Sequence, residues 1–473
     1  MAERGEDRSM SETERDPIHS SMYSTHSRDY VEGVSVEVCN IMTQLGYGEE
    51  IRRGRIERYR ERDMLFNASS YHFTHFTAGS KAEGLTCWAE SDHDWLHVLK
   101  DVVCVEAEVD LHTIPDHTEV YRMDTRTYPG HCRMLLERRA STQITLISNS
   151  LCDDGKGNAL LSSSLFLDEL SKIELKHGVR LERAGPSLPM SLSRFRINVD
   201  NVHAIHCQCP CILQRWAERP RHWPSPDVVL KVVSLGSFVT PNGLKKSEYK
   251  YLEWRICFNI GETELVNNLN GTQAKLYVIL KMIVKEVLKP TNKEITSFVL
   301  KNIILWQAES NSPAMFQERN LIHWLHDALG TLRTVIASTQ LPYYMIPERN
   351  LMADCGLHDE QQHKWVTDVT AMIEEGPRAI LRLPKIRQAI ICHPEPLLWF
   401  SRRRMELEML QLELTKNCLV NYGECDDTDI ILQIVRRMNE IVREVCLRMF
   451  IEGSTLNEIE GNVMEGVLSR MLM

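Results

Sequence analysis

The chain of 473 residues lacks long apolar runs, since no window reaches the roughly 18 unbroken apolar residues that a membrane span needs. It also lacks an apolar segment near its first residue. Residues 1–17, MAERGEDRSMSETERDP, are charged and polar, so no secretory signal is expected. We therefore expect a cytoplasmic protein with no membrane partner, in which residues 1–28 form a disordered tail.

Excess positive charge is also missing, because the formal net charge is -10. This balance argues against nucleic-acid binding driven by the charge of the whole surface. A local basic stretch remains in IRRGRIERYRER (Ile51 to Arg62), which contains six arginines. Glu57 and Glu61 interrupt it, so a solvated helix with internal ion pairs is the more common interpretation. A ligand-binding face is the alternative.

The 14 cysteines are scattered along the chain, which is typical of reduced thiols in the cytosol. The densest group is HAIHCQCPC, where Cys207, Cys209 and Cys211 would share one face of a strand. The spacing C-x-C-x-C differs from the C-x₂-C spacing of zinc knuckles. Buried or partly exposed thiols are therefore favoured over a metal site.

Apolar periodicity predicts an α/β first half followed by an all-helical second half. A helix is expected from Asp29, bent near Gly46 and Gly48 and continuing to about Asp63. Ser225 as a cap, Pro226 in the first turn and Gly236 at the end predict a short helix. Strands are expected in residues 71–80 and 94–107, and further helices in residues 272–289, 294–309 and 401–419.

Two acidic residues, Asp92 and Asp94, stand one residue apart in a strand-like run, so their side chains would share a face opposite His93. Like charges this close repel each other unless a cation lies between them. Carboxylate oxygens suit Mg²⁺ or Mn²⁺, and Gly79 and Ser80, 13 positions upstream of the two acids, offer N–H groups and a hydroxyl to substrate phosphates.

This pair alone is a modest signal, because most D-x-D pairs are surface residues of strands. Asp200 in INVDNVHAI strengthens it, since an unpaired acid in an apolar strand is costly and two-metal phosphoryl transfer needs a further carboxylate. The three acids together predict a metal-dependent phosphoryl-transfer site.

With this order of a Gly-Ser pair and three acids, the sequence resembles the nucleotidyltransferase core of cyclic GMP-AMP synthase and its animal relatives, the cGAS-like receptors and male-abnormal (Mab) proteins. The resemblance covers roughly residues 30–352 and rests on motifs in the family's order. These are the Gly-Ser pair with D-x-D, GPSLPM…INVD, HWPSPDVVLKVVSLGSFVTPNG, EWRICFNIGETEL, LKMIVKEVL, TSFVLKNIILW and YYMIPERNLM.

The resemblance implies an α+β, bilobal nucleotidyltransferase fold, with a mixed β-sheet N-lobe, a long spine helix and an all-helical C-lobe. It divides the chain into the tail, a nucleotidyltransferase core at residues 29–264 and a helical Mab-type C-lobe at residues 265–352. Residues 353–473 extend beyond the last family motif as a helical C-terminal extension whose role stays open.

Carried over residue by residue, Gly79 and Ser80 would hold a triphosphate, and Asp92, Asp94 and Asp200 would bind two Mg²⁺ or Mn²⁺ ions. Asp200 would assist deprotonation of the attacking hydroxyl. Arg255 would contact a nucleobase or the acceptor nucleotide. The remaining nucleotide-pocket residues implied by the resemblance are Glu262, Lys281, Ser297, Phe298 and Lys301.

The sequence also departs from the family pattern. Asp92 replaces a glutamate, Cys257 and Asn259 replace serines, and Phe298 replaces a tyrosine that stacks on a base, keeping the stacking face without the hydroxyl. These changes bear on which nucleotides are joined. VNNLNGTQAKLYV has no His or Cys where cyclic GMP-AMP synthase carries its zinc thumb, so no structural zinc is expected.

The resemblance implies an innate immune sensor that makes a cyclic dinucleotide, with cyclic GMP-AMP expected, from ATP and GTP. A cyclic-dinucleotide receptor would read the product. The expected activator is double-stranded RNA or another nucleic acid, bound on a face that includes Arg52, Arg53 and Arg55. Two alternatives remain open: a catalytically silent Mab-type scaffold, and a template-free transferase that extends an RNA end.

Overall fold

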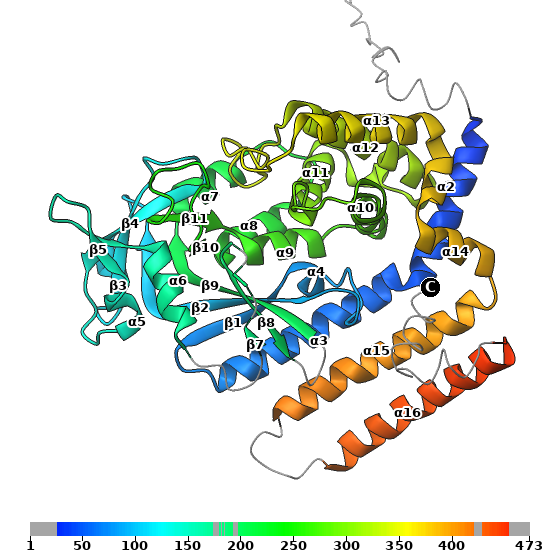
Figure 1. Cartoon of the computed structure of the whole chain (residues 1–473), viewed down its shortest axis with the longest axis horizontal. Helices are drawn as coiled ribbons and strands as arrows, with labels where there is room; N and C mark the ends of the chain where they lie inside the picture. The colour runs from blue at the N-terminus through cyan, green and yellow to red at the C-terminus, as the bar shows by residue number, and fades with distance from the viewer. Residues whose placement is uncertain are drawn as a thin grey trace, which may run out of the picture.

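The computed structural model describes residues 26–453 except 174–178, 181, 184, 193–196 and 421–427. A lobe of strands and a lobe of helices lie side by side, and two long C-terminal helices run below them (Figure 1). Residues 1–25 of the predicted tail lie outside the described residues. The tail prediction is too long at its end, because Ser27 caps the first described helix and Arg28 begins it.

A bent helical rod, drawn in blue, runs from the upper right of Figure 1 down to the underside of the strand lobe and connects the two lobes. It consists of α2 (Arg28–Met42), a π-helical turn (Thr43–Tyr47) and α3 (Glu49–Ala68). The bend lies at Gly46, whose φ of 84° interrupts the helical backbone in a conformation that glycine adopts without steric cost. The predicted helix with a bend near Gly46 is therefore confirmed, and its second part runs to Ala68.

A mixed sheet forms the strand lobe, with the order β1-β2-β3-β4-β11-β10-β9-β8-β7 and a further pairing between β2 and β9. The extra pairing closes six of the strands into a ring. The longest strands are β2 (His93–Val105) and β9 (Ile197–Gln208). The others are β1 (Phe73–Ala78), β3 (Glu119–Asp124), β4 (His131–Arg138), β5 (Leu151–Asp153), β6 (Ala159–Leu161), β7 (Val179–Arg180), β8 (Ser187–Leu192), β10 (Ser237–Thr240) and β11 (Glu253–Cys257).

Strand β2 pairs in parallel with both β3 and β9, while β1 runs antiparallel to it. A register shift between Leu99 and Val103, with Asp101 at a φ of 63°, bends β2 in its middle. Its first half therefore lies between β1 and β9, and its second half lies between β3 and β9. The bend allows β2 to pair with β1 at the open edge of the sheet and with β3 in the closed ring.

Helices cover the strand lobe and build the second lobe. Their bounds are α4 (Gly79–Ala82), α5 (Thr145–Ser148), α6 (Ser163–Ser171), α7 (Pro210–Ala217), α8 (Pro226–Leu235), α9 (Asn259–Asn267), α10 (Gly271–Ile283), α11 (Ser297–Ser310), α12 (Leu321–Ser338), α13 (Asp359–Glu375), α14 (Pro384–Cys392), α15 (Leu397–Val420) and α16 (Thr428–Ile451). The predicted short helix from Pro226 to its glycine end is confirmed as α8. The helix predicted for residues 272–289 ends at Leu288, and Lys289 follows in the left-handed region, directly before Pro290.

The predicted fold class is confirmed, since a mixed sheet lobe with a spine helix precedes a helical lobe. One hydrophobic core runs through both lobes, and its largest buried side chains include Trp216, Trp254 and Tyr277. The predicted boundary at residue 264 falls inside α9, so the division at 264 and 352 stays a prediction. Among the described residues, no helix has the length and apolar character that a bilayer crossing requires.

The described part of the C-terminal extension contains α13 to α16, and α15 and α16 share a small core of their own. Helix α15 packs along α3. Arg55 of α3 and Glu408 of α15 form a bidentate ion pair, with Nε–Oε1 and Nη2–Oε2 distances of 2.8 and 2.7 Å, and both side chains are 1% exposed. Arg55 Nη1 also donates to the carbonyls of Gly46 and Gly84.

The predicted nucleic-acid face on Arg52, Arg53 and Arg55 is wrong for two of its three residues. Arg52 is 4% exposed and donates hydrogen bonds to the carbonyls of Glu83, Leu269 and Val266. Arg55 is buried against α15 as described. Only Arg53 is exposed, and it pairs with Glu49 one turn earlier. Arg52 and Arg55 hold the spine helix to its neighbours, so both are inaccessible to a nucleic acid.

Replacing Arg55 by Ala is expected to lower the free energy of unfolding by about 3–5 kcal/mol, because Glu408 would keep a buried charge without its cation. Urea denaturation measures the loss. Arg53→Ala is the matched control on the same helix, and its exposed pair should change stability by less than about 1 kcal/mol. The double variant Arg55→Met/Glu408→Met should recover much of the loss. Equal losses at Arg55 and Arg53 would contradict this account.

Candidate nucleotidyltransferase site

Two carboxylates lie side by side where β2 and β9 begin to pair. Asp94 and Asp200 are direct partners in this parallel register, so their side chains leave the same face of the sheet. Ser187 on β8 donates a hydrogen bond to Asp200 Oδ1 at 3.0 Å. The third predicted acid, Asp92, is exposed and lies just before the first residue of β2. Asp94 and Asp200 are thus neighbours across strands, a closer pairing than the sequence could predict.

The turn before the site is shaped around Asp94. Ala78 is the cross-strand partner of Asp94 on β1, and Gly79 follows with a φ of +62° at the start of α4. A Cβ atom added to Gly79 would lie 2.1 Å from Asp94 Oδ2. Glycine is therefore required at this position for two reasons, the left-handed backbone and the close approach of the carboxylate.

The electrostatic environment of Asp94 is unfavourable to its negative charge. Burial, followed by the charges of Asp200 and Asp92, raises the pKa of the Asp94 carboxyl to about 6. Lys301 opposes this shift only in part. A divalent cation between these carboxylates would reverse the repulsion, and an all-oxygen donor set suits Mg²⁺ or Mn²⁺. The residues present therefore fit a divalent ion at Asp94 and Asp200, and Asp92 is close enough for its charge to act on Asp94.

A second acidic group lies elsewhere in the strand lobe. Among the described residues, the one compact set with metal-ligand atoms within 4.8 Å of one another is Glu106, Glu108 and Cys211. Glu106 follows the last residue of β2, whereas Asp94 is its second residue, so up to about 40 Å of strand separates them. This set is separate from the predicted triad, whose carboxylates are more widely spread.

Lys281 lies where the resemblance predicts a nucleotide-binding lysine. Its Nζ donates to Ser80 Oγ at 3.1 Å and lies 4.8 Å from the centre of the Tyr277 ring. Burial lowers the pKa of Lys281 to about 8, so its ammonium is still mostly charged at neutral pH. The structure thus brings together Ser80 and Lys281, which are 201 positions apart in the chain.

Lys301 lies at the centre of a buried ionic network. Its Nζ is 2.6 Å from a carboxylate oxygen of Glu83 and 3.6 Å from one of Glu262. Burial alone would lower the pKa of Lys301, but these two carboxylates raise it. Tyr343 donates its hydroxyl hydrogen to Glu262 at 2.5 Å. Glu83 and Tyr343 were not predicted as site residues, although Glu83 follows the Gly-Ser pair and Tyr343 is the first residue of the YYMIPERNLM motif.

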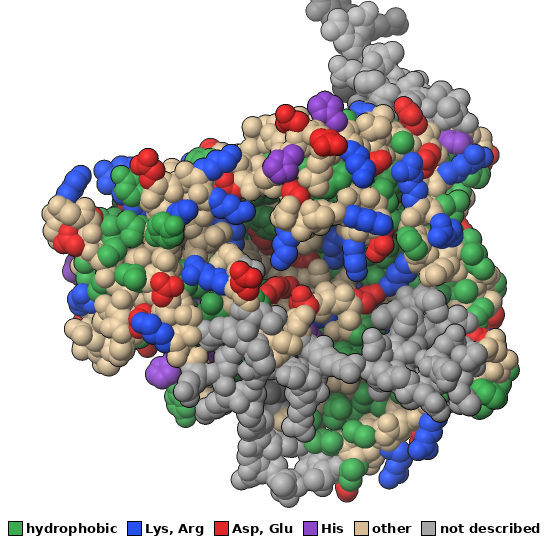
Figure 2. Space-filling model, in the orientation of Figure 1, with side chains coloured by type: hydrophobic (Ala, Val, Ile, Leu, Met, Phe, Trp, Pro, Cys, Tyr) green, Lys and Arg blue, Asp and Glu red, His purple; other side chains and the backbone are tan. Residues whose placement is uncertain are grey.

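The other predicted nucleotide contacts lie around this network. Phe298 is half-buried, with its ring 5.6 Å from that of Tyr343 and 5.8 Å from Lys301 Nζ. Ser297 is exposed at the first turn of α11, and its carbonyl accepts from Tyr277. Arg255 is half-buried on β11. The face drawn in Figure 2 is hollowed between the two lobes, and side chains of both charges line the hollow.

The cysteine-rich segment is mostly interior. Cys207 and Cys209 are buried, and hydrogen bonding among neighbouring thiols together with burial raises the pKa of both, which keeps them protonated. Cys211 is exposed, and its backbone N–H donates to Glu106. The described cysteines form no disulfide. The interpretation of this segment as buried or partly exposed thiols agrees with these positions.

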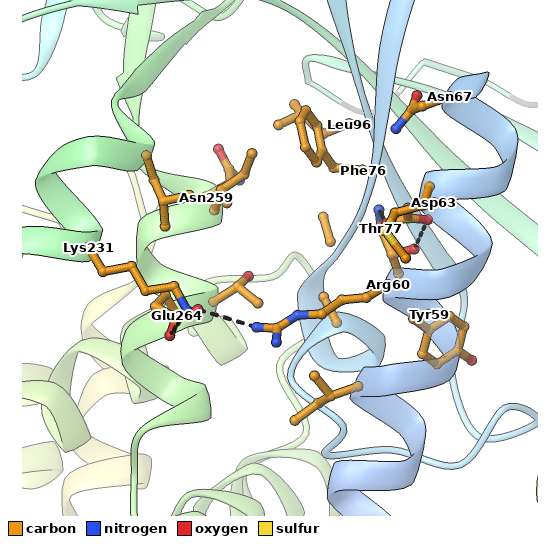
Figure 3. A pocket seen from close by; sticks show the side chains of 17 residues that line it. Tyr59, Arg60, Asp63, Asn67, Phe76, Thr77, Leu96, Lys231, Asn259 and Glu264 are labelled. Atoms are coloured by element: carbon orange, nitrogen blue, oxygen red, sulfur yellow. Dashed lines mark hydrogen bonds and ion pairs between the residues drawn. The ribbon is translucent and has the colours of Figure 1, made fainter. Parts of the chain in front are cut away.

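A cavity of about 370 Å³ lies behind the Gly79 turn, between α3, β1 and α8–α9 (Figure 3). Arg60 and Lys231 both pair with Glu264 at one side of it, with distances of 3.2 and 2.7 Å. The rest of its wall is largely apolar. Asn259, which replaces a serine of the family pattern, lines it, but Asp92, Asp94 and Asp200 do not. The cavity is therefore separate from the carboxylate site.

Two family models match adjacent parts of the chain. The Mab-21 protein nucleotidyltransferase domain matches residues 108–268, and the Mab-21 protein HhH/H2TH-like domain matches residues 272–370. Together they cover more than half of the sequence. The chain belongs to the Mab-21 family and has both its nucleotidyltransferase and its helical C-terminal domain.

A curated relative points in the same direction. The chain is 27% identical over 152 residues to a cyclic GMP-AMP synthase-like receptor of Aethina tumida. These residues make up 32% of this chain, and the chain spans only 36% of the length of that relative. The resemblance to cGAS-like proteins of the Mab family is confirmed at the level of the family.

Replacing Asp94 by Asn is expected to raise the melting temperature of the protein in EDTA at pH 7.5. The pKa of Asp94 is raised above its unfolded value, so ionising it in the folded state costs free energy. This cost is absent below the unfolded pKa of 3.8, grows as pH rises to about 6, and is complete above that pH. The gain from Asn should therefore shrink as pH is lowered toward 4.

The control is Asp116→Asn, whose side chain is fully exposed, and it should shift the melting temperature little at any pH. Saturating Mg²⁺ or Mn²⁺ should stabilise the wild type more than the Asp94→Asn variant. A stabilisation by Asn that grows at low pH would contradict the proposed environment of Asp94.

Proposed function

We propose that the protein is a metal-dependent nucleotidyltransferase that joins ATP and GTP into a cyclic dinucleotide, with cyclic GMP-AMP expected. The observation that carries the proposal is the side-by-side placement of Asp94 and Asp200 at the Gly79 turn. Asp200 lies within the stretch, residues 108–268, that matches the family's nucleotidyltransferase domain. A scaffold without catalysis has no need for two half-buried carboxylates that repel each other beside a phosphate-binding type of turn.

In this proposal Asp94, Asp200 and Asp92 hold two divalent ions, which supply activation of a ribose hydroxyl and stabilisation of the leaving pyrophosphate. Gly79 leaves room for the Asp94 carboxylate, and its neighbour Ser80 with Lys281 contacts the triphosphate. The role of Lys281 fits its position, because a half-buried ammonium near Ser80 can neutralise phosphate oxygens.

The second part of the pocket would bind bases and the acceptor nucleotide. Phe298 offers an apolar ring face for stacking, and Arg255 offers hydrogen-bond donors. Glu262 and Lys301 neutralise each other and hold Tyr343 against Phe298, so they position this wall. Ser297 contributes from the start of α11.

As a sensor, the protein would be activated by double-stranded RNA or another nucleic acid and would act in the cytoplasm. The product would be read by a cyclic-dinucleotide receptor. This part of the proposal rests on the relative's printed name and on the family resemblance. The activator would have to bind a surface other than that of the buried Arg52 and Arg55.

The direct test incubates the purified protein with radiolabelled ATP and GTP, Mg²⁺ or Mn²⁺, and either double-stranded RNA, double-stranded DNA or neither. A phosphatase-resistant product is expected in at least one lane, and it should disappear in the Asp92→Ala/Asp94→Ala variant. A product that persists in this variant, or transfer only to the ends of added RNA, would contradict the cyclase proposal.

Gly79→Ala should abolish product formation, because its Cβ would lie 2.1 Å from the carboxylate oxygen of Asp94. Gly155→Ala is the matched control. Gly155 also has a positive φ, +77°, but a Cβ there meets nothing within 4 Å. Both variants bear a similar backbone strain of roughly 1–2 kcal/mol. Activity is therefore expected to survive in Gly155→Ala only, and equal activities would refute the role of the Gly79 turn.

A further inference from the structure

Arg349 lies in the YYMIPERNLM segment of the helical lobe and reaches the strand lobe. Its side chain is 9% exposed, and its guanidinium carbon lies 5.1 Å from the centre of the Tyr343 ring. The stem passes over Gly130, where an added Cβ would lie 2.6 Å from Arg349 Cδ. The path of this side chain therefore depends on glycine at position 130, directly before β4.

Arg255 extends toward the same place from the strand lobe. His131 and Arg255 are direct cross-strand partners on β4 and β11, so they share a face of the sheet beside Gly130. Burial and the charges of Arg349 and Arg255 lower the pKa of His131 to about 3. Burial and the charge of Arg255 also lower the pKa of Arg349. Both arginines thus lie beside the Gly130–His131 segment, close enough for each charge to act on the other at the seam between the lobes.

No protein group neutralises this pair within the described part of the chain. Neither guanidinium forms an ion pair or a hydrogen bond with an acceptor there. Glu262 is the acid close enough to influence Arg349, but its carboxylate already interacts with Lys301 and Tyr343. An arginine that is nine-tenths buried without a counter-charge is costly unless a ligand supplies the charge.

We propose that Arg349 and Arg255 form a phosphate-binding site for a nucleotide, separate from the triphosphate site at Gly79, Ser80 and Lys281. Two adjacent guanidinium groups match a phosphate, because each can donate two parallel hydrogen bonds to its oxygens and the dianion removes their repulsion. A nucleobase edge would occupy the donors of one arginine and leave the like charges unbalanced. The inference rests on the proposed function for the nature of the ligand.

The site adjoins the rest of the pocket through a continuous set of contacts. Arg349 stacks near Tyr343, Tyr343 bonds to Glu262, and Glu262 pairs with Lys301. Lys301 in turn contributes to the electrostatics of Asp94. A phosphate at Arg349 would therefore belong to a nucleotide bound at the end of the cleft away from the carboxylates. The acceptor nucleotide and the linear intermediate both carry such a phosphate.

The test measures binding of GMP, AMP, guanosine, adenosine and inorganic phosphate to the full chain by calorimetry in EDTA. The wild type should bind a nucleoside monophosphate at least about tenfold more tightly than its nucleoside, as expected for hydrogen bonds to a charged group. Arg349→Met should remove this preference, and Arg349→Lys should keep part of it. The melting temperature of ligand-free Arg349→Met should not fall, because an unbalanced charge has been removed.

The matched control is Arg215→Met, which alters an exposed arginine that pairs with Glu348, the residue before Arg349. It should leave the phosphate preference intact. The proposal is overturned if Arg349→Met keeps the preference for the nucleoside monophosphate, or if it weakens the binding of nucleosides as much as that of nucleotides. It is also overturned if the variant weakens the binding of GMP but not of AMP, which would indicate base recognition. Inorganic phosphate binding as tightly as the nucleotides would overturn the nucleotide assignment.

The binding measurement does not depend on catalytic activity, because EDTA removes the divalent ions that the proposed reaction requires. Intact Arg349-dependent binding with no product in the radiolabel assay would refute the proposed function alone. Product formation without Arg349-dependent binding would refute the phosphate site alone.

Discussion

The parallel register between β2 and β9 is the constraint on which the site depends, because it fixes Asp94 beside Asp200. The two carboxylates repel each other, and the pKa of Asp94 rises to about 6 as a result of burial and of the neighbouring charges. The fold sustains this arrangement by closing the strands into a ring and by bending β2 at its middle. The glycine turn before α4 then fits against the carboxylate, with no room for a side chain at Gly79. The repulsion between Asp94 and Asp200 lowers the stability of the folded protein, and the same arrangement of carboxylates suits divalent cations.

The segment between α4 and β2, which leads directly into Asp92, is held from three directions. Glu83 pairs with Lys301 of the helical lobe, and Glu90 pairs with Lys385 of α14. Glu408 of α15 accepts a hydrogen bond from Trp88 N while it pairs with Arg55 of the spine helix. The C-terminal extension is thus part of the surroundings of the site. Helix α15 covers Arg55, one of the three arginines that the sequence alone suggested as a ligand face.

Much of the site could be predicted from the sequence, since Asp92, Asp94, Asp200 and the Gly-Ser pair stand in a recognisable order. The predicted sharing of one strand face by Asp92 and Asp94 was less accurate, because β2 begins at His93 and the closest pair is formed across strands. Arg52 and Arg55 were misassigned because their partners are distant in sequence, Glu408 lying 353 positions from Arg55. Arg349 went unnoticed for the same reason, as its neighbours Gly130 and Arg255 come from the other lobe. Burial by sequence-distant partners is the information that local patterns do not contain.

The most direct test of the central claim is a count of Mn²⁺ ions bound per chain, by electron paramagnetic resonance, in the presence of ATP that cannot be hydrolysed at its α-phosphate. Two ions per chain are predicted for the wild type, with loss of binding in both Asp94→Asn and Asp200→Asn. The Asp116→Asn control should bind as the wild type does. If Asp94→Asn and Asp200→Asn bound Mn²⁺ as tightly as the wild type, the paired carboxylates of β2 and β9 would not be the metal site, and the account would be contradicted.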